Sequence, residues 1–281
     1  MNFDEYFEER DGFPAPRWSA LTESKIPLTR ENGAAFLDEW SERLWQTLGD
    51  SYEIIDTKHF VCVSGFDSAH GDLFAGACER AWDRVLSGLP GVAKAREYPR
   101  YLVIAFNHMK VFLRYAASFY PDGGEYGMPA GMHIGDGLGH FIVGPEAIAS
   151  QERTITHELT HAMLDHLVLP RWLDEGLAQR MAAIAGLRQS RLITAELLDE
   201  HREFWNSGNI EQFWSGESFS ALGESQKYSY QMAEALVDML PGKEERIYEF
   251  IRNAKWEDGG RAAAQEILGS DLAELISAFL P

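Results

Sequence analysis

The spacing of apolar residues changes at Pro170, and this change constrains the fold more than any other feature of the sequence. Up to residue 168, short apolar runs such as RYLVIAFN (100–107) alternate with stretches of helical spacing, whereas beyond Pro170 the helical spacing continues almost without interruption. Short apolar runs between helices predict a sheet with helices packed against it. The sequence therefore predicts an α+β chain, with a small mixed sheet in its N-terminal part and a mostly α-helical C-terminal part.

The same patterns predict the individual elements. In the N-terminal part we expect two strands joined by a turn within 52–65, strands at 100–107 and 140–145, and helices at 29–49, 67–89, 109–120 and 146–168. In the C-terminal part we expect helices at 172–185, 191–206, 226–240, 243–254, 259–267 and 271–279. Residues 1–30 are predicted to be irregular, and the glycine-rich segment 121–139 to be a loop or a bent strand.

The chain has no internal repeat and no low-complexity linker, so we expect one compact unit rather than two separable domains. Residues 1–49 are predicted to form an N-terminal arm and helix, and 50–281 the main domain. Within that domain a mixed lobe of 50–168 would precede a helical lobe of 169–281.

The composition narrows the classes of partner. Lys and Arg number 25 and Asp and Glu 44, giving a net charge of −19 that repels phosphate backbones and argues against nucleic-acid binding. No apolar run approaches the ~18–20 residues of a membrane span, and the acidic N-terminus lacks the apolar segment of a signal peptide. Cys62 and Cys78 are expected to be buried free thiols, which fits a cytoplasmic location.

The segment THELTHAMLDH (156–166) contains His157, Glu158 and His161 in the spacing HExxH. Residues four apart lie one turn apart on a helix, so the two histidines present their imidazoles to one point, as two ligands of a tetrahedral zinc ion must. Glu158 lies beside them, where its carboxylate can take a proton from a zinc-bound water without becoming a ligand. The spacing therefore predicts a catalytic zinc site.

A third ligand is expected from PRWLDEGLAQRM (170–181). Pro170 ends the first helix, so a second helix can return antiparallel and bring Glu175, 14 residues after His161, to the metal. Gly176 and Ala178 have almost no side chain, which would let the two helices approach closely. His166 would point away from the helix face that carries His157 and His161, so Glu175 is preferred as the third ligand.

Each of these residues also has an ordinary structural interpretation. A helix with two partly exposed histidines would produce the HExxH spacing without a metal. Glu175 alone would be a solvated carboxylate near a helix start, where the helix dipole favours it. The two segments together, with a proline turn between them, favour the metal site.

The stretch HELTHAMLDHLVLPRWLDEGLAQRM (157–181) resembles the gluzincin metallopeptidases of the thermolysin-like MA superfamily, especially the bacterial branch with HExxH, a short spacer and WLxEGxA. The segments YSYQMAEALVDML (228–240) and DGGRAAAQEILGSDLAELISAFL (258–280) are similar to later parts of this branch. The resemblance implies a zincin-like fold, with Zn²⁺ held by His157, His161 and Glu175 and with Glu158 as the general base.

The resemblance also implies a tyrosine, from the helix at 226–240, that donates a hydrogen bond to the developing oxyanion. Aligning Val237 and Leu240 with the pattern of the branch selects Tyr230. Tyr228 is the alternative, and either tyrosine would also fit an ordinary core position.

Four other polar residues are candidates for the surroundings of the site. A zinc-bound histidine normally donates its second nitrogen to a carboxylate or a carbonyl, and Asp165 and Asp174 are both close to His161 in sequence. His133 and His140 flank the glycine-rich segment, where they could line a cleft or lie on a plain surface loop.

The leading functional hypothesis is an intracellular zinc-dependent metallopeptidase that hydrolyses a peptide or protein substrate without an acyl-enzyme. The alternative is a non-catalytic zinc-binding protein of the same fold that acts through protein binding, and a third interpretation is an α/β domain without metal. For the first hypothesis, the strand at 140–144 is predicted to be an edge strand to which an extended peptide adds by backbone hydrogen bonds. A central, fully paired strand is the alternative at this position.

Overall fold

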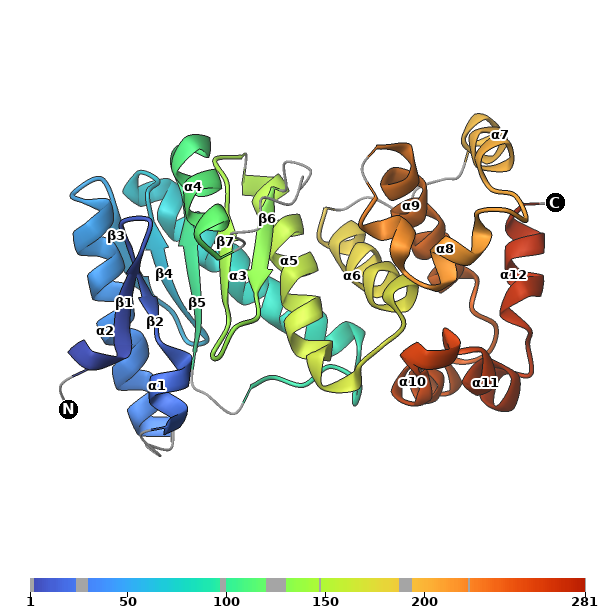
Figure 1. Cartoon of the computed structure of the whole chain (residues 1–281), viewed down its shortest axis with the longest axis horizontal. Coiled ribbons are helices and arrows are strands. Elements are labelled where there is room, and N and C mark those ends of the chain that lie inside the picture. The colour runs from blue at the N-terminus through green and yellow to red at the C-terminus, as the bar shows by residue number, and fades with distance from the viewer. Residues whose placement is uncertain are drawn as a thin grey trace. The chain divides into compact units, whose positions relative to one another are not determined.

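The computed structural model has a mixed α+β fold, as the apolar spacing predicts (Figure 1). It describes residues 3–23, 30–96, 100–119, 130–146, 148–186, 194–221 and 223–280. No helix within these ranges has the length and apolar character needed to cross a bilayer.

Contacts between residues divide the chain into two compact units. The first comprises Met1–Asp83 and Ala95–Glu158, and the second comprises Arg84–Lys94 and Leu159–Pro281. Two helices, α3 (Ser68–Gly88) and α5 (Ile148–Leu164), run continuously from one set of residues into the other. The lobes expected at 50–168 and 169–281 stay a prediction.

The first unit contains a five-stranded sheet in the order β3-β4-β5-β7-β6. Its strands are β3 (Glu53–Asp56), β4 (Phe60–Ser64), β5 (Tyr101–Ala105), β6 (Gly131–Ile134) and β7 (His140–Val143). The three inner strands are parallel to one another, and β3 and β6 are antiparallel to their neighbours. The strands expected within 52–65, 100–107 and 140–145 are therefore confirmed.

The prediction that residues 140–144 form an edge strand is wrong. β7 lies between β5 and β6 and pairs with both. Its residues Phe141, Ile142 and Val143 are all fully buried, as is typical of a strand covered on both faces. The edge next to β7 is occupied instead by β6, which lies within the segment that was expected to be a loop or a bent strand.

Helices cover both faces of this sheet (Figure 1). On one face, α2 (Arg30–Leu48) and α4 (Met109–Phe119) contribute Trp40 and Phe112 to a core that includes Val61 and Val63 of β4. Phe60 directly precedes Val61 on β4 and so points to the other face, where it contacts Trp82 of α3. Alternate residues of a strand point to opposite faces, so this buried strand requires apolar residues at every position.

Residues 1–30 were expected to be irregular, and for the described part this is wrong. β1 (Phe7–Arg10) and β2 (Phe13–Pro16) form a two-stranded antiparallel sheet, followed by α1 (Trp18–Glu23). The Trp40 indole donates a hydrogen bond to the Pro14 carbonyl at 3.0 Å, which fixes β2 against α2. A two-stranded sheet has two free edges, so it accepts prolines that a central strand would exclude.

The second unit is helical, as expected. Its main helices are α6 (Arg171–Ala185), α7 (Ala195–Phe204), α8 (Ile210–Trp214), α9 (Glu224–Met239), α10 (Glu244–Asn253), α11 (Arg261–Ala263) and α12 (Leu272–Phe279). The helix expected at 259–267 consists of α11 followed by a π-helical turn, Ala264–Leu268. The short helix α8 was not expected, and residues 191–193 of the helix predicted at 191–206 lie outside the described ranges.

Gly176 brings α6 and α9 together. A Cβ at this position would lie 2.5 Å from the Ala233 carbonyl oxygen and 2.7 Å from Val237 Cγ2, both on α9. This small residue was expected at a contact between the helices of the HExxH and WLxEG segments. The close approach is instead between α6 and α9, and it places the α9 face that carries Tyr230 against the α6 face that carries Glu175.

Candidate metal centre

A tight corner between two helices positions the HExxH and Glu175 residues. α5 ends at Leu164, a 3-10 turn covers Asp165–Leu167, and α6 begins at Arg171 directly after Pro170. Val168, within the corner, has φ +32°, which is unusual for a β-branched residue. The corner returns the chain so that the first turns of α6 lie close to the last turns of α5.

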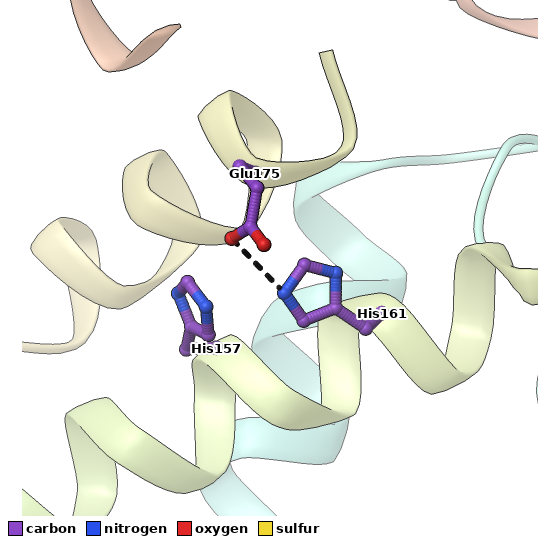
Figure 2. A group of neighbouring side chains, drawn as sticks. All are labelled: His157, His161 and Glu175. Atoms are coloured by element: carbon purple, nitrogen blue, oxygen red, sulfur yellow. Dashed lines mark ion pairs between the residues drawn. The ribbon is translucent and has the colours of Figure 1, made fainter. Parts of the chain in front are cut away.

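The three residues predicted to be metal ligands lie together (Figure 2). One ligand atom from each of His157, His161 and Glu175 can be chosen so that all three atoms lie within 4.8 Å of one another. His161 Nε2 lies 3.3 Å from Glu175 Oε2, and the glutamate side chain is only 2% exposed. Two imidazole nitrogens and one carboxylate oxygen are a donor set that suits zinc with one position left open. The residues present therefore fit a metal ion.

The second ring nitrogen of His161 also contacts a carboxylate. Nδ1 lies 2.9 Å from Asp174 Oδ2. Of the two aspartates that the sequence left open, Asp174 makes this contact, whereas Asp165 lies exposed in the 3-10 turn. Burial lowers the pKa of His161, but the nearby charges of Asp174 and Glu175 outweigh it and raise the pKa well above its usual value. The surroundings of this imidazole therefore stabilise a positive charge.

Besides His161, Glu175 contacts two further side chains. Arg171 Nη2 lies 2.7 Å from Glu175 Oε1, and the Tyr230 hydroxyl donates to the same oxygen at 3.3 Å. Burial lowers the pKa of Arg171, but Glu175 and, less strongly, Tyr230 and Asp174 outweigh it and raise the pKa. Arg171 was not expected at the site, although its spacing of four residues from Glu175 is a recognisable signal for a helical ion pair.

Glu158, the predicted general base, is held by the sheet of the first unit. Its Oε2 accepts a hydrogen bond from the backbone N–H of His133, on the edge strand β6, at 2.9 Å. The N–H and C=O of one strand residue point to the same side, so the His133 carbonyl also faces away from β7. His133 thus contributes through its backbone, a role that its side-chain type does not reveal.

Tyr228 and His140 lie elsewhere. The Tyr228 hydroxyl donates to Glu200 Oε2 at 3.2 Å, and its ring packs against His201. His140 is 1% exposed in the core of the first unit, with Nε2 2.8 Å from the Tyr115 hydroxyl. Of the two tyrosines, Tyr230 is the one beside Glu175, and a hydrogen bond from it to an oxyanion stays a prediction.

Comparison of the chain with models of known protein families gave no match, and comparison with curated proteins gave none either.

Proposed function

We propose that this protein is a zinc-dependent metallopeptidase with a zincin-like site of the gluzincin type. The observation that carries the proposal is the grouping of His157, His161 and Glu175 within 4.8 Å, with Glu158 on the same helix as both histidines. A zinc ion held there would lower the pKa of a bound water to about 7 and polarise a substrate carbonyl. A protein of this fold that had lost its activity would be expected to lack at least one of these four side chains. All four are present here, which favours the catalytic interpretation over the non-catalytic one.

Each protein group has a defined task in this proposal. Glu158 Oε2 takes the proton of the attacking water and later passes it to the leaving amine. The hydrogen bond from His133 N–H orients that carboxylate before substrate arrives. On substrate binding the Tyr230 hydroxyl would turn from Glu175 Oε1 and donate its one hydrogen bond to the oxygen on which negative charge develops, and no acyl-enzyme is formed.

The corrected sheet order changes how substrate would be held. β6, rather than β7, is the edge strand on this side of the described sheet, and His133 lies on it next to Glu158. We infer that an extended peptide adds alongside β6 by backbone hydrogen bonds. Recognition through the backbone predicts tolerance of many side chains in the substrate.

The first experiment is to measure zinc in the purified protein and to profile cleavage of a diverse peptide library with and without a chelator. We expect one zinc per chain and cleavage that chelation abolishes and zinc restores. A zinc-loaded protein that cleaves nothing in the library would favour the non-catalytic zinc-binding alternative. A protein without affinity for zinc would remove the metal from both interpretations.

The replacement Glu158→Gln tests the general base. Glutamine has nearly the same shape but cannot accept the proton, so hydrolysis should fall about 10²–10⁴-fold while zinc content is unchanged. Glu249→Ala, at an exposed position on α10, is the control that should alter neither property. Loss of zinc in Glu158→Gln would show that Glu158 is a ligand or a structural residue instead.

A further inference from the structure

The two carboxylate oxygens of Glu175 have different surroundings. Oε1 is contacted by Arg171 Nη2 at 2.7 Å and by the Tyr230 hydroxyl at 3.3 Å. Oε2 is the oxygen that faces His161, 3.3 Å from its Nε2. Carboxylates bind metals through one oxygen or through both, and the choice sets the coordination number.

We propose that Arg171 is a positioning residue that engages Glu175 Oε1 and so restricts Glu175 to binding the metal through Oε2 alone. This inference rests on the proposed metal site and adds a residue that neither the HExxH nor the WLxEG pattern includes. Ligation through one oxygen keeps the site four-coordinate, with three protein atoms and one open position for water or substrate.

The packing of Arg171 supports a fixed geometry. Gly216 lies against the stem of Arg171, since a Cβ at residue 216 would be 2.9 Å from Arg171 Cβ. Gly216 also has φ +82°, so a larger residue is disfavoured there for two reasons. The stem is thereby confined on one side while the guanidinium reaches Glu175. A planar guanidinium presents donors in fixed directions, which lysine cannot reproduce.

The second contact to Oε1 is fixed by a different pair of helices. Tyr230 comes from α9, whose Ala233 and Val237 meet α6 at Gly176. Tyr230, Ala233 and Val237 are spaced three and four residues apart and so share one face of α9. One partner of Oε1 thus lies on the same helix as Glu175 and the other on the neighbouring helix. Rotation of the carboxylate would break both contacts, so the two together resist it.

The test uses zinc affinity and the visible spectrum of the cobalt(II)-substituted protein, neither of which requires hydrolysis. Four-coordinate cobalt absorbs much more strongly than five- or six-coordinate cobalt. In Arg171→Met we expect zinc affinity to fall about 10–100-fold, because Glu175 loses the partner that orients it. We also expect the cobalt absorption to weaken, because Glu175 can then bind through both oxygens. Arg171→Lys should give a smaller loss, and Tyr230→Phe, which removes the weaker contact, a smaller loss still.

Arg180→Met is the matched control, because Arg180 is also on α6, is similarly exposed and pairs with Asp238 at 3.4 Å. It should leave affinity and spectrum unchanged. An Arg171→Met protein that is merely less stable, with wild-type zinc affinity and cobalt spectrum, would overturn the inference while leaving the proposed function intact. If Arg171→Met does not fold, unchanged metal properties in both Arg171→Lys and Tyr230→Phe would overturn it equally. A wild-type protein that binds neither metal would overturn both proposals.

Discussion

A fully buried histidine and a partly buried one have opposite electrostatic surroundings in this molecule. His140, in the sheet core of the first unit, lies among the rings of Trp40, Phe119 and Tyr115. Burial, helped by the nearby charges of His133 and Arg96, lowers its pKa well below the usual value. His161, on α5, is also largely removed from water, with 17% of its side chain exposed, yet its two carboxylate neighbours raise its pKa well above the usual value.

The difference shows that partners, rather than burial, determine what a buried histidine can do. Desolvation disfavours the charged imidazole at both positions. Aromatic rings and a hydroxyl leave that penalty in place at His140, whereas Asp174 and Glu175 reverse it at His161. A site that stabilises a positive charge on a ring nitrogen will also stabilise a bound cation there, once the nitrogen has lost its proton. Four predictions test this comparison.

The largest effect is expected from Glu175→Ala. This change removes one of the three proposed ligands, so the zinc affinity should fall by more than the roughly 10–100-fold that loss of an outer partner costs. Competition with a coloured zinc chelator would measure the dissociation constant, with Glu249→Ala on α10 as the control. Zinc binding equal to that of the wild type would remove Glu175 from the ligand set.

The next effect is expected from Asp174→Asn, which keeps the side-chain shape and removes the charge facing His161 Nδ1. A neutral amide orients the imidazole less strongly and makes it a weaker donor, so zinc affinity should decrease about 10–100-fold. Asp165→Asn is the matched control, because Asp165 is exposed in the turn after α5. Equal zinc affinities for the two variants would contradict the role given to Asp174.

Tyr115→Phe tests the other histidine of the comparison. Removing the hydroxyl leaves His140 Nε2 without its 2.8 Å partner in the core, so the free energy of unfolding should fall by about 1–2 kcal/mol. Zinc affinity should not change. Urea unfolding and zinc titration on the same preparation would measure both, and a loss of zinc affinity without a loss of stability would show that His140 is not simply a core residue.

The local parts of the candidate site could be predicted from the sequence. The helix around His157 and His161 depends on spacing within one segment, and Pro170 marks the turn that brings Glu175 back. Contacts between distant segments could not be predicted in this way. The His133 N–H to Glu158 hydrogen bond requires β6 to lie beside α5, and a backbone donor leaves no trace in residue type.

The errors in the fold have a similar cause. The short apolar run at 140–143 is compatible with an edge or a central strand, and only the pairing with both β5 and β6 decides between them. The small side chain of Gly176 signals a close approach but not which helix approaches. The hairpin at 7–16 was missed because two prolines usually argue against strands, and this rule is relaxed when both strands lie at an edge.

A third buried histidine, His201 on α7, extends the comparison within the second unit. Trp205 Nε1 can only donate, so its 3.2 Å contact makes His201 Nδ1 an acceptor, and Nε2 donates to Gln231 Oε1 at 3.1 Å. Both partners are neutral. Burial lowers the pKa of His201 to about 4, the direction seen for His140 and the opposite of that for His161.

This lowered pKa predicts a modest pH dependence of stability. The unfolded chain has an ordinary histidine pKa of about 6.5 and so binds a proton that the folded chain, with a pKa of about 4, does not. The stabilisation is complete above pH ~6.5 and is lost as the pH falls towards 4. In His201→Gln, which keeps a polar side chain without this titration, the free energy of unfolding should decrease less steeply between these pH values. Urea unfolding at several pH values would give the slope of the unfolding free energy against pH for the wild type and for His201→Gln. Identical slopes would mean that His201 titrates equally in the folded and unfolded chain. Neutral partners and burial would then not suppress its charge.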